Sequence, residues 1–292
     1  MDSRRGIPLL HFYSMLNLAK ALVYLEAPAR LTKWEHFNHG LTDLARLKSA
    51  DTFQLANESV QVRPGVFKTL HAVLAGREIP SRTSLNIKDL LAYCVWIGHE
   101  FQEVYREGNN LLHGKFQLRM DDNIQTAWVH ARLPSNEVRA KCGSWGNFVA
   151  RAPQFVTVFR RVQSSVKGEY HFESGSAKFS SKGRWRPASR TLGVQVRPVR
   201  LYRLLLHRPE TYETEYLVPL QGLSHPLPEA CVIYAISFHL SQLVRYQPHV
   251  YDAILGKGEA WLLEAFIKQC PTAFSHIMLN HLWRKEHQFV LP

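Results

Sequence analysis

The sequence predicts an α+β protein in which N- and C-terminal helices form one helical bundle and a basic, β-rich lobe lies between them in the chain. Three observations support this prediction. Apolar residues recur every three or four positions near both ends, which is typical of amphipathic helices. From residue 115 onward the period changes to two, which indicates strands. Most of the positive charge falls in that same middle region.

The N-terminal part, residues 1–114, is expected to be helical with one small hairpin. Its first apolar helix face begins at Leu9 and ends before Pro28, because proline disrupts a helix. Gly76 is a typical helix stop, and Asn86 is a typical N-cap. The expected elements are a helix at 9–26, a hairpin at 53–62 with its turn at 56–58, a helix at 66–75 and a helix from 87 to about 105.

The middle region, residues 115–222, is expected to form the basic β-rich lobe. Pro198 interrupts a long alternating pattern, so that segment is either two strands or one bent edge strand. Residues 174–189 are rich in Gly, Ser, Lys and Arg, which predicts a long mobile loop. The expected strands are 125–132, 155–162, 169–172, 192–206 and 214–218.

The C-terminal part, residues 223–292, returns to the helical period and is expected to pack on the N-terminal part. Pro271 is expected to end the second of its helices. The expected helices are 230–246, 258–269 and 273–285.

The charge of the chain is concentrated between Arg139 and Arg208. This segment carries 15 Lys and Arg against only Glu169 and Glu173, a local net charge of +13 compared with +12 for the whole chain. Such a segment attracts polyanions. Aromatic rings stand between the cations, and this combination suits a phosphate backbone with stacked bases. The rings are Trp145, Phe148, Phe155, Phe159, Tyr170, Phe172, Phe179, Trp185 and Tyr202.

We therefore expect this segment to bind nucleic acid, with DNA and RNA both open. The alternative is a solvated β-surface whose aromatic side chains face inward. Trp185 lies between two arginines in a stretch without apolar periodicity, so it is expected to be at least partly exposed. The candidate nucleic-acid-binding residues are Arg160, Arg161, Lys167, Lys178, Lys182, Arg184, Trp185, Arg186 and Arg190.

Several other classes of site have no support in the sequence. The four cysteines are scattered and form no CxxC pair, which fits a reducing cytoplasm and gives no zinc ribbon. No apolar run reaches the roughly 18–20 residues of a membrane span. The chain contains no GxxxxGK[ST], GxSxG or GxGxxG pattern. We expect no cofactor, no metal site and no membrane association, and a cytoplasmic location.

Several segments resemble the YaaC-like family of bacterial proteins. They are residues 12–22 (FYSMLNLAKAL), His39-Gly40-Leu41, Gly65-Val66-Phe67 and residues 240–251 (LSQLVRYQPHVY), and they span nearly the whole chain in the order of the family. The resemblance implies a shared fold and little about activity.

The first helix and the His39-Gly40 pair are also similar to a more distant group, the HEPN nucleotide-binding and RNase domains. Their hallmark is an Arg followed by a His, which Arg106 and His113 match with six residues between them. The resemblance implies metal-free RNA cleavage, with His113 as general acid or base and Arg106 holding the phosphate. Asn109 or Asn110 would orient the phosphate or the imidazole. Alternatively, Arg106 ends a helix and His113 is a satisfied structural residue.

The leading expectation is a nucleic-acid-binding protein of the YaaC-like and HEPN-like type, a component of a bacterial antiviral-defence or nucleic-acid-handling assembly. Other subunits of a complex, or a homodimer, are the expected protein partners. One alternative is a metal-independent RNase that uses Arg106 and His113. Another is a scaffold whose basic face binds an acidic protein.

Overall fold

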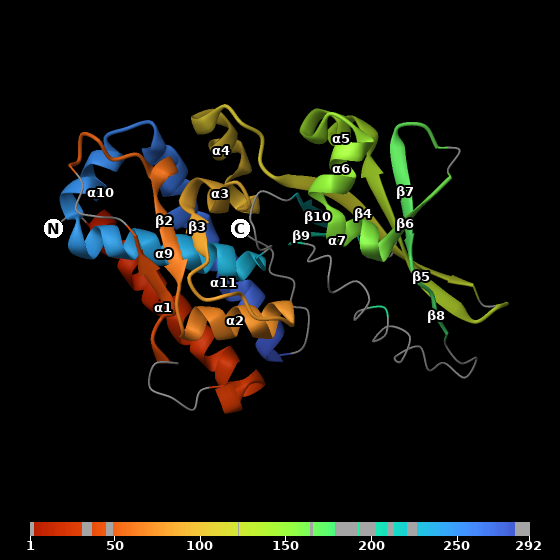
Figure 1. The fold of residues 1–292 in the computed structure, drawn as a ribbon, viewed down its shortest axis with the longest axis horizontal. Coiled ribbons are helices and arrows are strands. Elements are labelled where there is room, and N and C mark those ends of the chain that lie inside the picture. Colours follow the sequence, from red (N-terminus) through yellow and green to blue (C-terminus); the bar gives the residue numbers. More distant parts are fainter. Residues whose placement is uncertain are drawn as a thin grey trace. The chain divides into compact units, whose positions relative to one another are not determined.

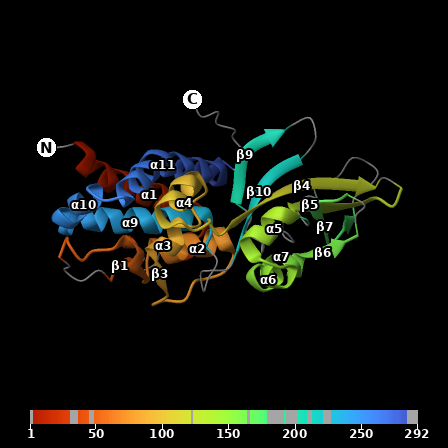
Figure 2. The ribbon, with the colours of Figure 1, turned by 90° about the horizontal axis from the view of Figure 1, so that it is seen from above.

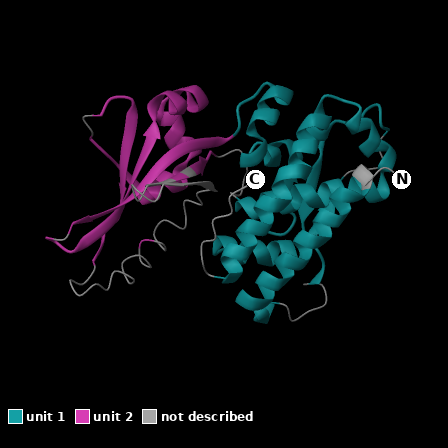
Figure 3. Ribbon diagram, turned by 180° about the vertical axis from the view of Figure 1, so that it is seen from behind, with its two compact units in different colours: residues 1–109, 227–292 teal, residues 110–226 magenta. Residues whose placement is uncertain are grey.

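The computed structural model of the chain describes residues 3–30, 37–44, 49–121, 123–163, 166–178, 192, 202–208, 213–220 and 227–283. The chain divides into two compact units (Figure 3). The helical unit comprises residues 1–109 and 227–292, and the sheet unit comprises residues 110–226. The predicted α+β class is confirmed, because N- and C-terminal helices share one unit and the middle of the chain is rich in strands.

Three long helices form the centre of the helical unit. α1 (Ser3–Glu26), α9 (Glu229–Tyr246) and α11 (Glu259–Trp283) pack against one another, and α2 (Val66–Ala75) packs on the first two (Figure 1). α9 is buried on nearly every side, as expected for a helix that is apolar all round. α11 runs through Pro271, so the predicted helix end there is wrong. Burial of Cys270 and Phe274 holds the chain helical on both sides of the proline.

A small antiparallel sheet lies in the same unit. It consists of β1 (Leu41–Asp43), β2 (Ser59–Val62) and β3 (Ser84–Asn86), with β2 in the centre. The hairpin predicted at 53–62 is wrong, because residues 55–57 form a 3₁₀ turn and β2 pairs with more distant segments. Leu55 is fully buried, so this turn points into the core instead of forming a strand.

Two glycines bring backbone segments into direct contact beside this sheet. Gly40 has a φ of +82° and Gly65 a φ of +144°. A Cβ on Gly65 would lie 2.6 Å from both the Asn38 carbonyl oxygen and the Gly40 Cα. The Val66 amide donates to the Asn38 carbonyl at 2.8 Å, so backbone hydrogen bonds hold the two segments at this separation. The spacing between them leaves no room for a side chain.

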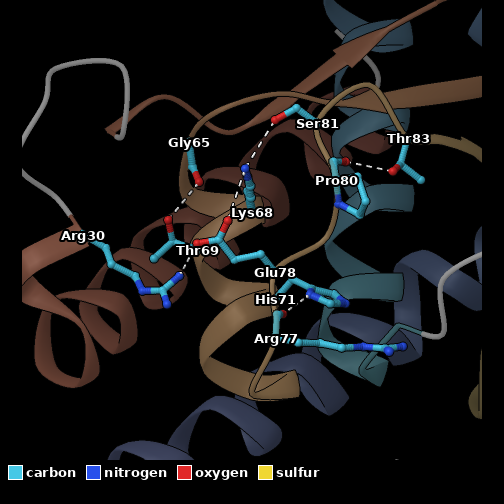
Figure 4. A network of polar contacts seen from close by, with 10 residues as sticks. All are labelled: Arg30, Gly65, Lys68, Thr69, His71, Arg77, Glu78, Pro80, Ser81 and Thr83. Atoms are coloured by element: carbon cyan, nitrogen blue, oxygen red, sulfur yellow. Dashed lines mark hydrogen bonds and ion pairs between the residues drawn. The ribbon is translucent and has the colours of Figure 1, made fainter.

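Polar contacts fix the loop that follows α2 (Figure 4). The helix ends at Gly76 in the left-handed conformation, as predicted. Glu78 forms ion pairs with Arg30 at 2.7 Å and Lys68 at 3.4 Å. A ring nitrogen of the buried His71 lies 3.0 Å from the Arg77 carbonyl oxygen. These contacts orient the chain toward β3.

The helix predicted from residue 87 to about 105 is divided into three pieces. α3 (Ile87–Leu91) has the predicted cap, since the Asn86 side chain accepts a hydrogen bond from the Asp89 amide at 3.0 Å. A 3₁₀ turn (Val95–Ile97) and α4 (Gly98–Tyr105) follow. The break places Cys94 in extended conformation and fully buries it, so core packing overrides the helical propensity of this segment. The remaining helix of the unit is α10 (Pro248–Leu255).

The sheet unit is built on a seven-stranded antiparallel sheet in the order β6-β7-β5-β4-β10-β9, with β8 paired to β5. The strands predicted at 125–132, 169–172 and 214–218 are confirmed. The strand predicted at 155–162 is correct only in its second half, because the helix α7 (Pro153–Val158) occupies the first half. The strands are β4 (Leu111–Asp121), β5 (Thr126–Pro134), β6 (Phe159–Val162), β7 (Glu169–Ser174), β8 (Ala177–Lys178), β9 (Tyr202–Arg208) and β10 (Glu213–Pro219).

Three short helices cover one face of this sheet. They are α5 (Ser135–Cys142), α6 (Trp145–Arg151) and α7 (Pro153–Val158), which lie beside β4 and β5 (Figure 2). The core between these helices and the sheet contains four fully buried phenylalanines that the sequence offered for base stacking. The expectation that they stack on bases is therefore wrong, and for these rings the alternative of inward-facing aromatic side chains is correct. They are Phe148, Phe155, Phe159 and Phe172.

Candidate nucleic-acid interface

The sheet has a second, polar face. On β4 and β5, Phe116 pairs with Ala131 on the helix-covered side, so the neighbouring pair of Lys115 and Arg132 lies on the other side. We call this side the polar face. Its members among the described side chains include Lys115, Gln117, Arg119, Trp128, His130, Arg132, Arg160, Glu169, His171 and Glu173.

The predicted nucleic-acid-binding residues that the structure describes lie on exposed edges of the sheet unit. Arg160 and Arg161 are exposed on β6, the outer strand at one end of the sheet. Lys167 is exposed in the connection between β6 and β7, and Lys178 is exposed at the end of β8. The other predicted residues lie outside the described part of the chain: Lys182, Arg184, Trp185, Arg186 and Arg190.

The guanidinium group of Arg161 is held by two aromatic rings. Its central carbon lies 5.0 Å from the ring centroid of Trp145 and 4.7 Å from that of Tyr170. These rings come from α6 and β7, and their centroids are 5.3 Å apart. Among the described residues none accepts a hydrogen bond from Arg161. The rings therefore restrain the guanidinium plane and leave its N–H edge available.

Arg161 also borders a cavity of about 520 Å³, which we call the edge cavity. Because β6 is an outer strand, the cavity reaches side chains of both faces: Tyr170 lies on the covered side and His171 on the polar face. The lining consists of Arg161, Val162, Gln163, Glu169, Tyr170 and His171. It offers an oxyanion several hydrogen-bond donors and one opposing carboxylate.

A pair of buried histidines lies next to this cavity. His130 Nε2 and His171 Nδ1 are 3.2 Å apart, and each residue is 8% exposed. Burial lowers the pKa of His130, and the charge of Arg119 lowers it further. Burial also lowers the pKa of His171, against the opposing effect of Glu169. Both imidazoles are therefore neutral at pH 7.

Glu169 balances part of the positive charge around the histidines. Its Oε2 lies 3.7 Å from Arg132 Nη1 and 3.5 Å from His171 Nε2. The carboxylate disfavours an anion in the edge cavity, whereas Arg132 and Arg161 favour one. The charge balance of the site therefore depends on the protonation of His171.

The candidate catalytic residues do not share a helix. α4 ends at Tyr105, and Arg106 adopts a left-handed conformation with φ 55° and pairs with Glu103 at 2.8 Å. His113 lies on β4, where its Nε2 is 3.1 Å from Glu215 Oε2. Arg106 belongs to the helical unit and His113 to the sheet unit. Catalysis by this pair stays a prediction.

The two asparagines of that motif have local partners. Asn110 Oδ1 accepts a hydrogen bond from Arg151 at 2.9 Å, at the start of β4. The Asn109 amide lies so close to Gly98 that a Cβ there would be 2.7 Å from its nitrogen. These contacts restrain the two side chains locally, and their role in orienting a phosphate or an imidazole stays a prediction.

Sequence reasoning missed the histidine pair and its neighbours on the polar face. The strand predicted at 125–132 places its alternate residues, which include Trp128, His130 and Arg132, on one side, but the sequence analysis did not single out this group. The pairing of β5 with β7, across 41 residues of sequence, is what brings His171 to His130. Only knowledge of the strand order could have indicated that contact.

These features define a mixed α+β protein of two compact units, one of which carries a cavity at a sheet edge that is lined by an arginine, a histidine and a glutamate. A family model described as YaaC-like Protein matches residues 7–282, so the chain belongs to the YaaC-like family. No curated protein and no solved structure matches the chain. Across the part of the chain that the structure describes, every helix is too short or too polar to span a membrane.

Proposed function

We propose that this protein binds nucleic acid through the β6–β7 edge of the sheet unit, with Arg161 as the principal phosphate contact. The observation that carries the proposal is the position of the Arg161 guanidinium. It lies over the rings of Trp145 and Tyr170 and borders the edge cavity. A planar guanidinium whose orientation is already restrained loses little entropy when its N–H groups bind a phosphate.

The surroundings of Arg161 support the same function. Arg160 and Lys167 are exposed on the same strand pair, so further phosphates of a polymer can be neutralised along the edge. Trp145 and Tyr170 are half-buried and present part of their surfaces beside the cation. A base can stack on the Arg161 guanidinium plane and contact the exposed parts of these rings, and such stacking contributes about 1–3 kcal/mol per base. A polyanion with planar bases therefore fits this edge better than an acidic protein surface does.

The proposal predicts a strong salt dependence. Binding of a single-stranded oligonucleotide, measured by fluorescence anisotropy, should weaken steeply between 50 and 200 mM salt, because phosphate contacts release counterions. The triple variant Arg160→Glu, Arg161→Glu and Lys167→Glu should weaken binding on the order of 100-fold and lower the salt slope by about 2, at roughly 0.7 per lost contact.

A matched control separates local contacts from net charge. Arg77 and Lys268 are exposed cations of the helical unit. Arg77→Glu and Lys268→Glu, extended by Arg82→Glu at a third exposed cation of this unit, change the net charge equally and should leave most of the affinity intact. Equal losses in both triple variants would mean that only the overall charge matters. Oligonucleotide affinity that does not change with salt concentration would instead favour the alternative of a scaffold that binds an acidic protein.

A further inference from the structure

Four buried polar atoms of the polar face have no hydrogen-bond partner among the described residues. They are Trp128 Nε1, His130 Nδ1, Glu169 Oε2 and His171 Nε2. Buried polar groups in folded proteins are nearly always hydrogen-bonded, so the unpaired atoms of the histidine pair and of Glu169, with a fourth on the same face of β5 at Trp128, require an explanation. His130 and His171 are both more than nine-tenths buried, and His171 lines the edge cavity.

The proton count of the histidine pair limits what it can bind. One ring nitrogen donates and the other accepts in the contact between His130 Nε2 and His171 Nδ1. Glu169 lies near His171 Nε2, which favours a proton on that nitrogen. His130 then donates from Nε2 and carries no proton on Nδ1. The neutral pair therefore offers one outward donor and one bare acceptor.

Adding one proton changes this pattern. The proton joins His130 Nδ1, so the singly charged pair keeps its internal hydrogen bond and has two outward N–H donors. A positively charged pair whose outward groups are both donors suits an oxyanion and offsets the carboxylate of Glu169. Among the described residues no three His, Cys, Asp or Glu side chains gather with the geometry for a metal ion.

We infer that the His130–His171 pair takes up one proton when a phosphate group of nucleic acid occupies the edge cavity. The inference rests on the proposed function and adds a proton-linked phosphate site to it. The phosphate contacts the side chains of Arg161 and His171, two residues that line the cavity. The proton adds to the pair from solvent, and no other bond forms or breaks.

The charges that face the pair explain the coupling. Arg119 on β4 and Arg132 on β5 lower the pKa of both histidines, whereas Glu169 and Glu173 on β7 oppose them. A bound phosphate offsets the two arginines, so the imidazolium becomes more stable. Proton uptake in turn offsets the repulsion between Glu169 and the phosphate. Binding and protonation therefore favour each other.

The sign of the pH dependence follows from this coupling. The pKa of the free pair lies below the ordinary histidine value. A bound phosphate raises the pKa of the pair in the complex above that of the free pair. Affinity should rise as pH falls between these two values, by up to about tenfold per pH unit for one proton.

The test is isothermal titration calorimetry of the full chain at pH 7 in buffers of different ionisation enthalpy. A single-stranded oligonucleotide and inorganic phosphate are the two probes. Net proton uptake upon oligonucleotide binding is expected, and His130→Gln and His171→Gln should each abolish it. His249→Gln, at an exposed histidine of the helical unit, should leave it unchanged.

The outcomes separate the inference from the function on which it rests. Oligonucleotide binding without proton uptake, or uptake that persists in both buried-histidine variants, overturns the inference alone. Absence of oligonucleotide binding overturns both. Uptake that only inorganic phosphate gives, and that both glutamine variants abolish, assigns the site to a free phosphate and contradicts the link to nucleic acid. The variants are needed in this arm because inorganic phosphate itself exchanges a proton near pH 7. If the glutamine variants do not fold, NMR of the wild type replaces them. Imidazole signals of His130 and His171 that keep the chemical shifts of the neutral ring upon oligonucleotide binding also overturn the inference.

Discussion

Replacement of Gly65 by alanine is expected to destabilise the helical unit by about 3 kcal/mol or more, from backbone strain combined with a steric clash. The new Cβ would lie 2.6 Å from the Asn38 carbonyl oxygen and from the Gly40 Cα, which are backbone atoms that cannot move aside alone. The φ of +144° is also a conformation that alanine rarely adopts. Urea unfolding followed by circular dichroism measures the effect.

Gly6 provides the matched control. It lies in α1, and a Cβ there would have nothing within 4 Å. Gly6→Ala should be neutral or stabilise the protein by up to about 1 kcal/mol, because alanine favours helix. A Gly65→Ala variant as stable as the wild type would show that the two glycine segments do not approach as closely as described.

The second large effect is expected from Glu229→Gln at pH 8. Burial raises the pKa of Glu229 to about 7, although a hydrogen bond from Trp96 opposes the shift. The side chain is buried at the start of α9, with Trp96 Nε1 at 2.9 Å from Oε1. Glutamine keeps an oxygen that can accept this hydrogen bond and carries no charge, so the variant should be more stable than the wild type at pH 8.

The pH window follows from the raised pKa. An unfolded Glu229 ionises near the ordinary value of 4.5, whereas the folded one ionises near 7. The folded state therefore loses stability as pH rises through this interval, by roughly 3 kcal/mol in total, and the loss is complete above pH 7. The Glu229→Gln variant should lack this pH-dependent loss of stability. Glu78→Gln, in an exposed ion pair, should change stability by less than about 1 kcal/mol at any pH. A wild type and a Glu229→Gln variant with parallel pH profiles would contradict the burial of this carboxyl group.

The long elements were predictable because their periodicity is strong and their ends carry specific residues. α1, α2 and α9 have continuous apolar faces. Gly76 ends α2 in the left-handed conformation, and the Asn86 side chain caps the start of α3. The short helices α5 and α6 were missed, since eight or fewer residues give too little periodicity to detect. Ser144 was the available signal, because its side chain caps α6 by accepting from the Asn147 amide.

Composition predicted which cations belong to the candidate site, but it did not predict how the aromatic rings are arranged around them. The concentration of charge indicated Arg160, Arg161 and Lys167, whose exposure requires no knowledge of strand pairing. The rings that hold Arg161 come from α6 and β7, and four of the other aromatic residues are core. Which rings face solvent depends on the register of the sheet, and local sequence does not determine that register.

Photo-crosslinking to a single-stranded oligonucleotide, followed by mass spectrometry of the crosslinked peptides, tests the central claim most directly. Irradiation joins bases to nearby aromatic side chains, so the product reports contact rather than net charge. We expect crosslinks at Trp145 or Tyr170, lost when Arg161 is replaced by glutamine and retained in Lys268→Gln. Crosslinks confined to the helical unit, or binding without any crosslink within residues 145–174, would contradict the assignment of the interface to this sheet edge.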